Sequence, residues 1–417
     1  MAKLFPFRAY RYSPRAGDPA RLLTQPYDKI TPEMQERYFA SSPYNLARVI
    51  RGQARPDDTA AGNVYTRAAR YLNDWAAQGI LARDPQPSLF AYFQKFEVEG
   101  VTRVRQGLIA LGAVEDYAEG VVFRHELTHS GPKRDRLELL RHTCAHFGQL
   151  FMLYDDAQLQ VDGWLDQAAR SEPAIRVCDE YGAEHSLWPI TDPDTIATIV
   201  RLMAPHRLLI ADGHHRYETA LAFRDENPQL AGAGKVMMTL VNMRSPGLVI
   251  LPTHRVVGNL PDFDPAQVLH GAKRFFAVEE LPGLEALENR LRAARPNQTV
   301  LGVMLRSPML QNEARFFALV TENAGLDVTV LHRTVLGQVL GLSEEAVREE
   351  RNIRYVRGFQ AAARELDAPG AQAVFFLNPV RVEQVAEVAF SGGVMPQKST
   401  DFFPKLLSGL TIYRIEE

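Results

Sequence analysis

The hydrophobic and polar positions along the chain follow two different periods. Apolar residues recur every three to four positions over 63–79, which predicts an amphipathic helix. Two runs rich in β-branched and aromatic residues over 88–117 are joined at Glu99–Gly100, which predicts a β-hairpin. A second hairpin is expected over 174–190, with its turn at Tyr181–Gly182.

The same patterning predicts the rest of the chain as a mixture of helices and strands. A short apolar strand before Asp212 runs directly into a helix, and a further helix is expected over 132–147. Past residue 262 helical and strand patterns alternate. The fold class is therefore mixed α/β, with an N-terminal α/β domain over 1–260 and a C-terminal α/β half over 261–417.

Composition narrows the class of protein. The 417 residues are 46% hydrophobic and 23% charged, which is typical of a soluble globular protein. A net charge of −3 gives no argument for nucleic acid or for an anionic membrane as partner. Cys144 and Cys178 lack metal-binding spacing. No apolar run is long enough for a membrane span, and the start lacks a signal peptide, so we expect a cytoplasmic protein.

The stretch "HELTH" matches the H-E-x-x-H pattern of zinc proteases. His125 and His129 would hold the metal, and Glu126 would act as base. Such a site needs a stable helix, but "GVVF" precedes the motif and Ser-Gly-Pro follows it at once. We therefore expect no zinc. His142 and His146, on the helix expected over 132–147, are interpreted as histidines of its polar face.

Basic residues follow this motif in the first turn of the same expected helix. Lys133, Arg134 and Arg136 lie where the helix dipole disfavours positive charge. A bound anion would explain the arrangement, because backbone N–H groups and basic side chains would converge on it. A solvated charged turn explains it equally well.

The stretch "LLIADGHHRYETAL" is the most specific signal in the chain. The glycine allows a phosphate to approach the backbone, the helix N-terminus supplies N–H groups, and Arg216 supplies a bidentate donor. His214 and His215 add donors or an acid–base pair near neutral pH. We interpret this turn as a phosphate site.

Near the C-terminus, "SGGVMPQKSTDFFPKLLSGL" comes close to a nucleotide-binding P-loop. Glutamine stands where the second glycine belongs, and a helical pattern precedes the loop, so a P-loop is not expected. The basic and hydroxyl side chains of this loop are candidates for contact with an anionic substrate, with solvated surface lysines as the alternative. These candidates are Lys398, Ser399, Thr400 and Lys405.

Taken together, these stretches resemble the DUF1015 family, a bacterial and archaeal family of unknown function, over essentially the whole chain. The sequence departs from the family pattern at Gln25 and Asp401. The resemblance is carried by the ordered motifs "FPFRAYRYSP", "TQPYDKIT", "SPYNLARV", "HELT" with "PKRDRL", "ADGHHRYETAL" and "MPQKSTDFFPKLLSG".

The strand–D-G-H-H-R–helix unit is also similar to that of the ParB/sulfiredoxin-like superfamily, which includes free-serine kinases. This resemblance implies a nucleotide-binding core to which the C-terminal α/β half is added. It implies that Gly213, His214, His215 and Arg216 hold a phosphate chain, with Asp212 at the strand end. The resemblance to the DUF1015 family also suggests serine or phosphoserine as a substrate.

The leading hypothesis is phosphoryl transfer between ATP or ADP and a small hydroxylated metabolite, with Mg²⁺ held by phosphates and by Asp212 or Asp28. Lys133 and Arg136 would join the turn in neutralising phosphate charge. The proposed catalytic residues are Glu126 as general base, His125 and His214. The proposed substrate-binding residues are Tyr27, Asp28, Asn45, Lys398, Ser399, Thr400 and Lys405.

Two other functions remain open from the sequence. One is a phosphatase acting on phosphoserine or a similar phosphomonoester. The other is a ParB-like nucleotide switch or adaptor that turns over no metabolite. Whether the chain is an enzyme, and whether it forms a homodimer, is left open.

Overall fold

The computed structural model describes all of the chain except residues 127–129, 307–312, 323–324, 397 and 416–417. The chain forms two compact units. Unit 1 comprises Met1–Val249 and Pro404–Glu417, and unit 2 comprises Ile250–Phe403. The chain therefore leaves unit 1 once, close to the expected boundary at residue 260, and returns to it with its last stretch.

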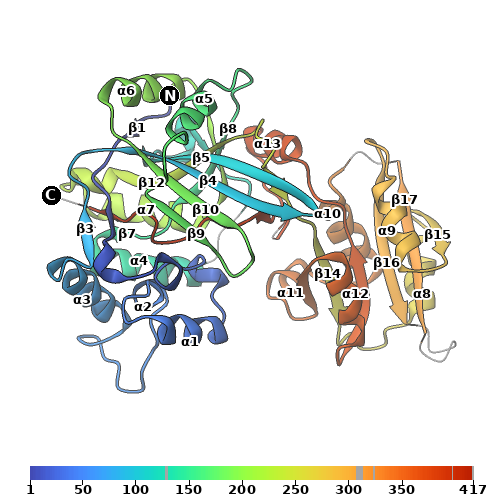
Figure 1. Cartoon of the computed structure of the whole chain (residues 1–417). Helices are drawn as coiled ribbons and strands as arrows, with labels where there is room; N and C mark the ends of the chain where they lie inside the picture. Colours follow the sequence, from blue (N-terminus) through green and yellow to red (C-terminus); the bar gives the residue numbers. More distant parts are fainter. Residues whose placement is uncertain (127–129, 307–312, 323–324, 397, 416–417) are drawn as a thin grey trace. The chain divides into compact units, whose positions relative to one another are not determined.

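Unit 1 is built on a large mixed sheet whose central strands are almost wholly buried (Figure 1). The described strands lie in the order β6 (Val122–Phe123), β11 (Leu208–Asp212), β8 (Leu150–Tyr154), β12 (Lys235–Asn242), β5 (Val101–Ala113), β4 (Leu89–Val98), β10 (Glu184–Ile190) and β9 (Ile175–Cys178), with β1 (Leu4–Phe5) beside β5. β6 is parallel to β11 and β8 is parallel to β12, whereas the other neighbours are antiparallel.

The helices of unit 1 pack in two groups. One group covers a face of the sheet through residues such as Ile199 and Tyr217, and the other forms a second core around Leu72 and Trp75. The first group is α5 (Gln160–Ala168), α6 (Pro193–Met203) and α7 (His214–Glu226), and the second is α1 (Pro32–Ser41), α2 (Ala47–Ile50), α3 (Val64–Ala77) and α4 (Ser130–Thr143). The start of α1 follows capping rules, since Thr31 accepts from the Met34 amide and a proline follows it.

Unit 2 contains an antiparallel sheet with a hydrophobic core on each face. Its described strands lie in the order β15 (Ala277–Leu281), β17 (Ala314–Thr321), β16 (Thr299–Arg306), β19 (Ala371–Phe376), β14 (Thr253–Gly258) and β18 (Ile353–Arg357). Phe375 and Phe376 of one central strand point to opposite faces and contribute to different cores, as the two-residue period of a strand requires.

The helices of unit 2 are short, and one of them is a π-helix over Leu331–Val339. The others are α8 (Pro265–Ala272), α9 (Leu284–Arg292), α10 (Asp327–Val330), α11 (Glu344–Arg348), α12 (Phe359–Arg364) and α13 (Val382–Phe390). No helix in the described part of either unit is long and apolar enough to cross a membrane.

The structure confirms the mixed α/β class, both hairpins and the strand-to-helix unit, but it corrects one helix. The helix expected over 132–147 ends at Thr143, because Cys144 takes φ of 45° and the chain then enters strand β7 (Ala145–His146). β7 pairs with β21 (Tyr413–Arg414) of the returning C-terminal stretch. The sequence analysis placed His142 and His146 on one helix, but in the structure only His142 lies on α4.

Candidate functional site

The turn between β11 and α7 has the geometry expected of the D-G-H-H-R motif. Gly213 takes φ of 102° and ψ of 23°, in the left-handed region that favours glycine. A Cβ atom there would lie 2.9 Å from Leu150 Cδ2 and 3.0 Å from Arg216 Nη2. The glycine is therefore required by both the backbone conformation and the close approach of neighbours.

Asp212, at the end of β11, lies among positive charges. A register shift in the pairing of β11 with β8 occurs just before it. Its Oδ2 accepts from Arg216 Nη2 at 3.0 Å and its Oδ1 accepts from Lys405 Nζ at 3.3 Å. Burial alone would raise the pKa of Asp212, but Lys405, Arg216 and Lys29 together hold it well below its usual value. Asp212 is therefore ionised at neutral pH.

Lys405 reaches this carboxylate from the C-terminal stretch of unit 1, almost two hundred positions away in sequence. The sequence grouped it with Lys398, Ser399 and Thr400, but the structure assigns those three residues to unit 2. In unit 2, the Ser399 hydroxyl donates to the Pro396 carbonyl, and the Lys398 carbonyl accepts from Arg255 Nη2 at 3.1 Å.

Two buried histidines lie behind the turn. The rings of His125 and His214 meet edge to face with centroids 4.7 Å apart, and His214 Nε2 accepts from the His125 amide at 3.4 Å. His125 Nδ1 lies 2.8 Å from the Ile210 carbonyl, which fixes the proton on Nδ1. Burial lowers the pKa of His125 to about 4 and that of His214 well below its usual value. Both rings are therefore neutral near pH 7.

Glu126, the proposed general base, lies next to these rings. Its Oε1 is 4.0 Å from His125 Nε2, which is close but longer than a hydrogen bond, and its side chain is 25% exposed. Glu126 thus has access to solvent while His125 is wholly buried. His129, the last residue of the H-E-x-x-H pattern, lies outside the described residues, and His125 precedes the start of α4 at Ser130.

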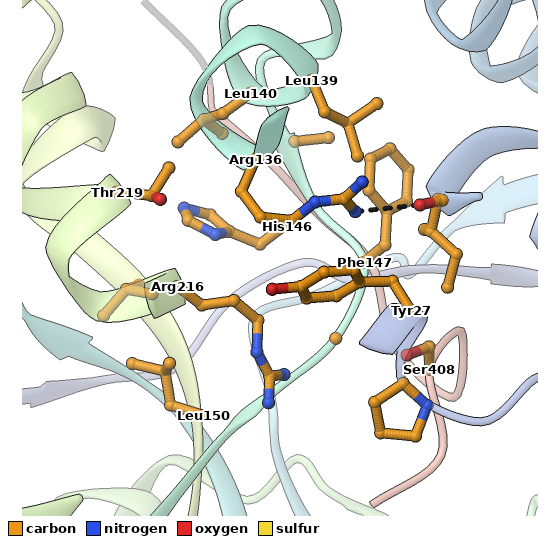
Figure 2. A pocket seen from close by; sticks show the side chains of 15 residues that line it. Tyr27, Arg136, Leu139, Leu140, His146, Phe147, Leu150, Arg216, Thr219 and Ser408 are labelled. Carbon is orange, nitrogen blue, oxygen red and sulfur yellow. Dashed lines mark hydrogen bonds between the residues drawn. The ribbon is translucent and has the colours of Figure 1, made fainter. Parts of the chain in front are cut away.

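A cavity of about 60 Å³ lies on the Arg216 side of the turn (Figure 2). It has room for about four to six water molecules, at roughly 10–15 Å³ for each. Its wall is apolar except for a few polar side chains. Those chains are Tyr27, Arg136, His146, Arg216, Thr219 and Ser408.

The aromatic ring of Tyr27 lies between two guanidinium groups in Figure 2. The Arg136 guanidinium carbon is 4.0 Å from the ring centroid, and both Arg136 and Arg216 act electrostatically on the phenol. Burial nevertheless raises the pKa of Tyr27. His146 lines the same cavity, and burial followed by the Arg216 charge lowers its pKa to about 4.

The structure separates the basic residues that the sequence placed together on α4. Arg136 lines the cavity, where its Nη1 donates to the Ile50 carbonyl at 2.9 Å and its Nε donates to Asp135. Lys133 instead donates to Glu218 at 2.5 Å, within an exposed groove of its own that Arg134 also lines. These residues therefore do not converge on a single point.

The remaining candidates of unit 1 have different surroundings. Asp28 is exposed beside the cavity residue Tyr27. Asn45 is fully buried: its Oδ1 accepts from the Ala47 amide at the start of α2, and its Nδ2 donates to the Arg21 carbonyl. The sequence did not propose Lys29, His146 or Ser408 as residues of this site. Lys29 had a signal, since it follows Tyr27–Asp28 in one motif.

The geometry does not fit the magnesium ligand that the sequence proposed at Asp212. Both carboxylate oxygens already face a cation, and Lys29 adds a third positive charge. Among the described residues there is no group of three or more His, Cys, Asp or Glu side chains arranged to hold a metal ion.

The motifs that build this site are those of one protein family. Residues 4–339 match the family described as "Protein of unknown function (DUF1015)". The chain belongs to the DUF1015 family. No curated protein matches its sequence.

Solved structures with a related arrangement are distant from this DUF1015 protein. A mutant free serine kinase in complex with ADP is 15% identical, with a TM-score of 0.39, over 74% of this chain and 92% of its own. A conserved hypothetical protein from Pyrococcus furiosus is 14% identical, with a TM-score of 0.36, over 72% of this chain and 94% of its own. SbnI with a C-terminal truncation, from Staphylococcus aureus, is 12% identical, with a TM-score of 0.35, over 72% and 87%. Similarities this distant do not indicate an activity for this protein.

Proposed function

We propose that this protein transfers a phosphoryl group between a nucleotide and a small hydroxylated metabolite, and that the β11–α7 turn of unit 1 holds the phosphates. One observation carries the proposal. A glycine turn at a helix N-terminus lies beside Arg216 and Lys405, two cations that both donate to the carboxylate of Asp212. Phosphoryl transfer needs this kind of charge neutralisation more than it needs covalent chemistry.

The phosphate side of the site follows from the charges. Arg216 and Lys405 bring two positive charges to the carboxylate of Asp212, and the charge of Lys29 acts on the same carboxylate. A phosphate chain at the first turn of α7 would share these two cations, while backbone N–H groups of that turn point toward it. Because His125 and His214 are neutral, they offer ring donors or acceptors without adding charge.

The acceptor side is supported by the cavity beside Tyr27. Its size, with room for about four to six water molecules, suits a metabolite of a few heavy atoms. Serine is the first acceptor to test because the family resemblance implies it. Glu126 is the proposed general base on the acceptor hydroxyl, with His125 4.0 Å away to orient its carboxylate.

Binding and transfer are tested separately. Calorimetry with ADP or ATP measures binding, and ³¹P NMR of mixtures with and without serine detects a new phosphomonoester; phosphoserine alone tests the phosphatase alternative. Arg216→Ala is expected to weaken nucleotide binding by roughly 10- to 100-fold, the loss of a charge-assisted contact of about 1.5–3 kcal/mol. Arg224→Ala is the matched control, because Arg224 lies on the same helix but pairs with Asp116 and Asp225.

Glu126→Gln tests the catalytic role. The substitution keeps size and polarity but removes the base, so we expect nucleotide binding to persist while transfer falls by roughly 100-fold or more. Nucleotide binding that is equal in wild type and Arg216→Ala would contradict the assignment of the turn. Transfer that survives Glu126→Gln would contradict the assignment of the base.

A further inference from the structure

A row of buried polar side chains crosses three neighbouring strands of the unit 1 sheet. His185 on β10 is paired in register with Gln94 on β4, and Gln94 is paired with Arg105 on β5. All three are at most 2% exposed. Arg105 Nε donates to Gln94 Oε1 at 3.0 Å. Such a row in the middle of a sheet is stable only if its members are hydrogen-bonded.

This row holds the segment that carries Lys405. Gln94 Nε2 donates to the Lys405 carbonyl at 2.9 Å, and Arg105 donates to the Pro404 carbonyl. Tyr92, two residues before Gln94 on the same face of β4, accepts from the Leu407 amide at 3.4 Å. Three hydrogen bonds, to the backbone of Pro404, Lys405 and Leu407, therefore fix the chain on both sides of Lys405.

The hydrogen bonds run in one direction through Tyr92 and His185. The Tyr92 hydroxyl lies 2.6 Å from His185 Nδ1, and His185 Nε2 lies 3.3 Å from Asp179 Oδ2. Since Gln94 also presents an N–H group to His185 Nδ1, the ring proton belongs on Nε2 and is donated to Asp179. Asp179 also accepts from the amides of Tyr181 and Ala183, so its carboxylate is fixed by its own hairpin turn.

At the Asp179 end, this series of hydrogen bonds holds a second segment of the site. Gln25 Nε2 donates to Asp179 at 3.1 Å and to Glu180 at 3.2 Å. Thr24, the preceding residue, exchanges backbone hydrogen bonds with Ser408 in both directions, at 3.3 and 2.8 Å. The segment continues directly to Tyr27 in the cavity and to Lys29, whose charge acts on Asp212.

We propose that this network, defined by Asp179, His185, Tyr92, Gln94 and Arg105, is a positioning device that locks segments 24–29 and 404–408 together and so places Lys405 against Asp212. A free lysine side chain loses rotamer entropy when it is fixed in one geometry. Because the backbone at Pro404, Lys405 and Leu407 is already anchored in the folded protein, its conformational entropy is not lost again when a ligand binds. Only the consequence for ligand affinity rests on the proposed function.

Tyr92→Phe in the full-length protein is the direct test, because it removes one hydroxyl and nothing else. Tyr154→Phe is the matched control: Tyr154 is also 1% exposed in the same sheet, but its hydroxyl donates to Asp162 and contacts neither segment. Hydrogen exchange without ligand should become about threefold to tenfold faster at the Leu407, Ser408 and Thr24 amides in Tyr92→Phe alone, as loss of one hydrogen bond implies. Unchanged exchange in Tyr92→Phe, or the same change in both variants, would overturn the proposal.

Gln25→Met provides a second variant should Tyr92→Phe not fold. It cuts the link to Asp179 and Glu180 while retaining volume, and faster exchange is expected at Thr24 and Ser408. No change at these two amides would contradict the claim that one network holds both segments.

A double-mutant cycle connects the device to Lys405. ADP binding should weaken about threefold to tenfold in Tyr92→Phe, but in a Lys405→Met background the same change should have no further effect. If Tyr92→Phe weakens ADP binding to the same extent in the Lys405→Met background, Tyr92 acts on ADP binding by a route that does not include Lys405. If wild-type protein binds no ADP, the proposed function fails, whereas the exchange experiment still decides whether the network holds the segments.

Discussion

Each unit contains a buried arginine in the middle of its sheet, and the two are satisfied differently. Arg105 on β5 of unit 1 and Arg255 on β14 of unit 2 are both 1% exposed, and burial lowers their pKa values to about 9 and about 10. Arg105 has a side-chain acceptor, Gln94, and holds the Pro404 carbonyl. Arg255 donates to the carbonyls of Thr253 and Lys398, but its Nε has no partner among the described residues.

Other buried polar groups near Arg255 also lack hydrogen-bond partners among the described residues. His332 Nε2 and Tyr355 Oη are likewise buried without a hydrogen-bond partner in the described part of unit 2, and the Arg255 charge acts on both residues. A buried polar network stabilises a fold when it is complete and weakens it when it is partly satisfied. The same residue type at the same depth therefore anchors a functional segment in unit 1 and is only partly satisfied in unit 2.

Acidification should give the largest difference in stability between the two units. Burial lowers the pKa of four described histidines in unit 1, His125, His146, His185 and His214, and of two in unit 2, His254 and His332. Below the unfolded value of about 6.5 the unfolded chain takes up protons that the folded rings refuse, so stability is lost as the pH falls.

At about 1 kcal/mol per pH unit for each histidine whose pKa falls to about 4 or well below its usual value, unit 1 should lose roughly 3 kcal/mol through His125, His146 and His214, and unit 2 roughly 2 kcal/mol, between pH 6.5 and 5.5. His185 adds to the loss of unit 1, because its pKa is also lowered. Free energies of opening from hydrogen exchange in β4 and β16, corrected for intrinsic rates, measure the two losses separately. Equal losses, or a larger loss in unit 2, would contradict the assignment of neutral buried histidines.

Arg105→Met should produce the next largest effect. It leaves Gln94 Oε1 and the Pro404 carbonyl without their donor, and each orphaned acceptor costs about 1–3 kcal/mol. Removal of the buried charge offsets part of this loss. We expect the free energy of opening of β4, β5 and residues 404–408 to fall by about 2–3 kcal/mol. An exchange pattern confined to β5 would show that the C-terminal segment is held independently.

Arg255→Met should have the smallest effect. The variant removes a charge that contacts two carbonyls and the Tyr355 ring and whose Nε has no hydrogen-bond partner among the described residues. Lys398 is exposed, so we expect water to replace the donor at its carbonyl. The free energy of opening of β14 and β19 should change by less than about 1 kcal/mol, because replacing a buried charge by an apolar group of similar volume is often neutral. A loss larger than that of Arg105→Met would reverse the comparison.

Much of the fold could be predicted because its elements have strong local periods. The hairpin turning at Glu99–Gly100 and the strand-to-helix unit at Gly213 follow directly from apolar runs and turn residues. The π-helix over Leu331–Val339 and the strand β7 were missed, because neither has a local signal. β7 exists only through its pairing with Tyr413–Arg414.

The site was predictable in part for the same reason. The β11–α7 turn is local in sequence, so its motif was visible. Nothing local distinguished Lys405 from Lys398, although the structure assigns them to different units. The network was not visible at all, because Gln94 is one of several polar residues in β4 and the carbonyl to which it donates lies 311 positions away.

The return of the C-terminal stretch to unit 1 has a consequence for the order in which the protein is made. Lys405 and Ser408 leave the ribosome only after all of 250–403 has been synthesised. At about 5–20 residues per second, the nascent first unit waits roughly ten to thirty seconds with Asp212, Tyr92 and Gln94 lacking their final partners. The site of unit 1 can therefore be assembled only after the whole of unit 2 has been synthesised.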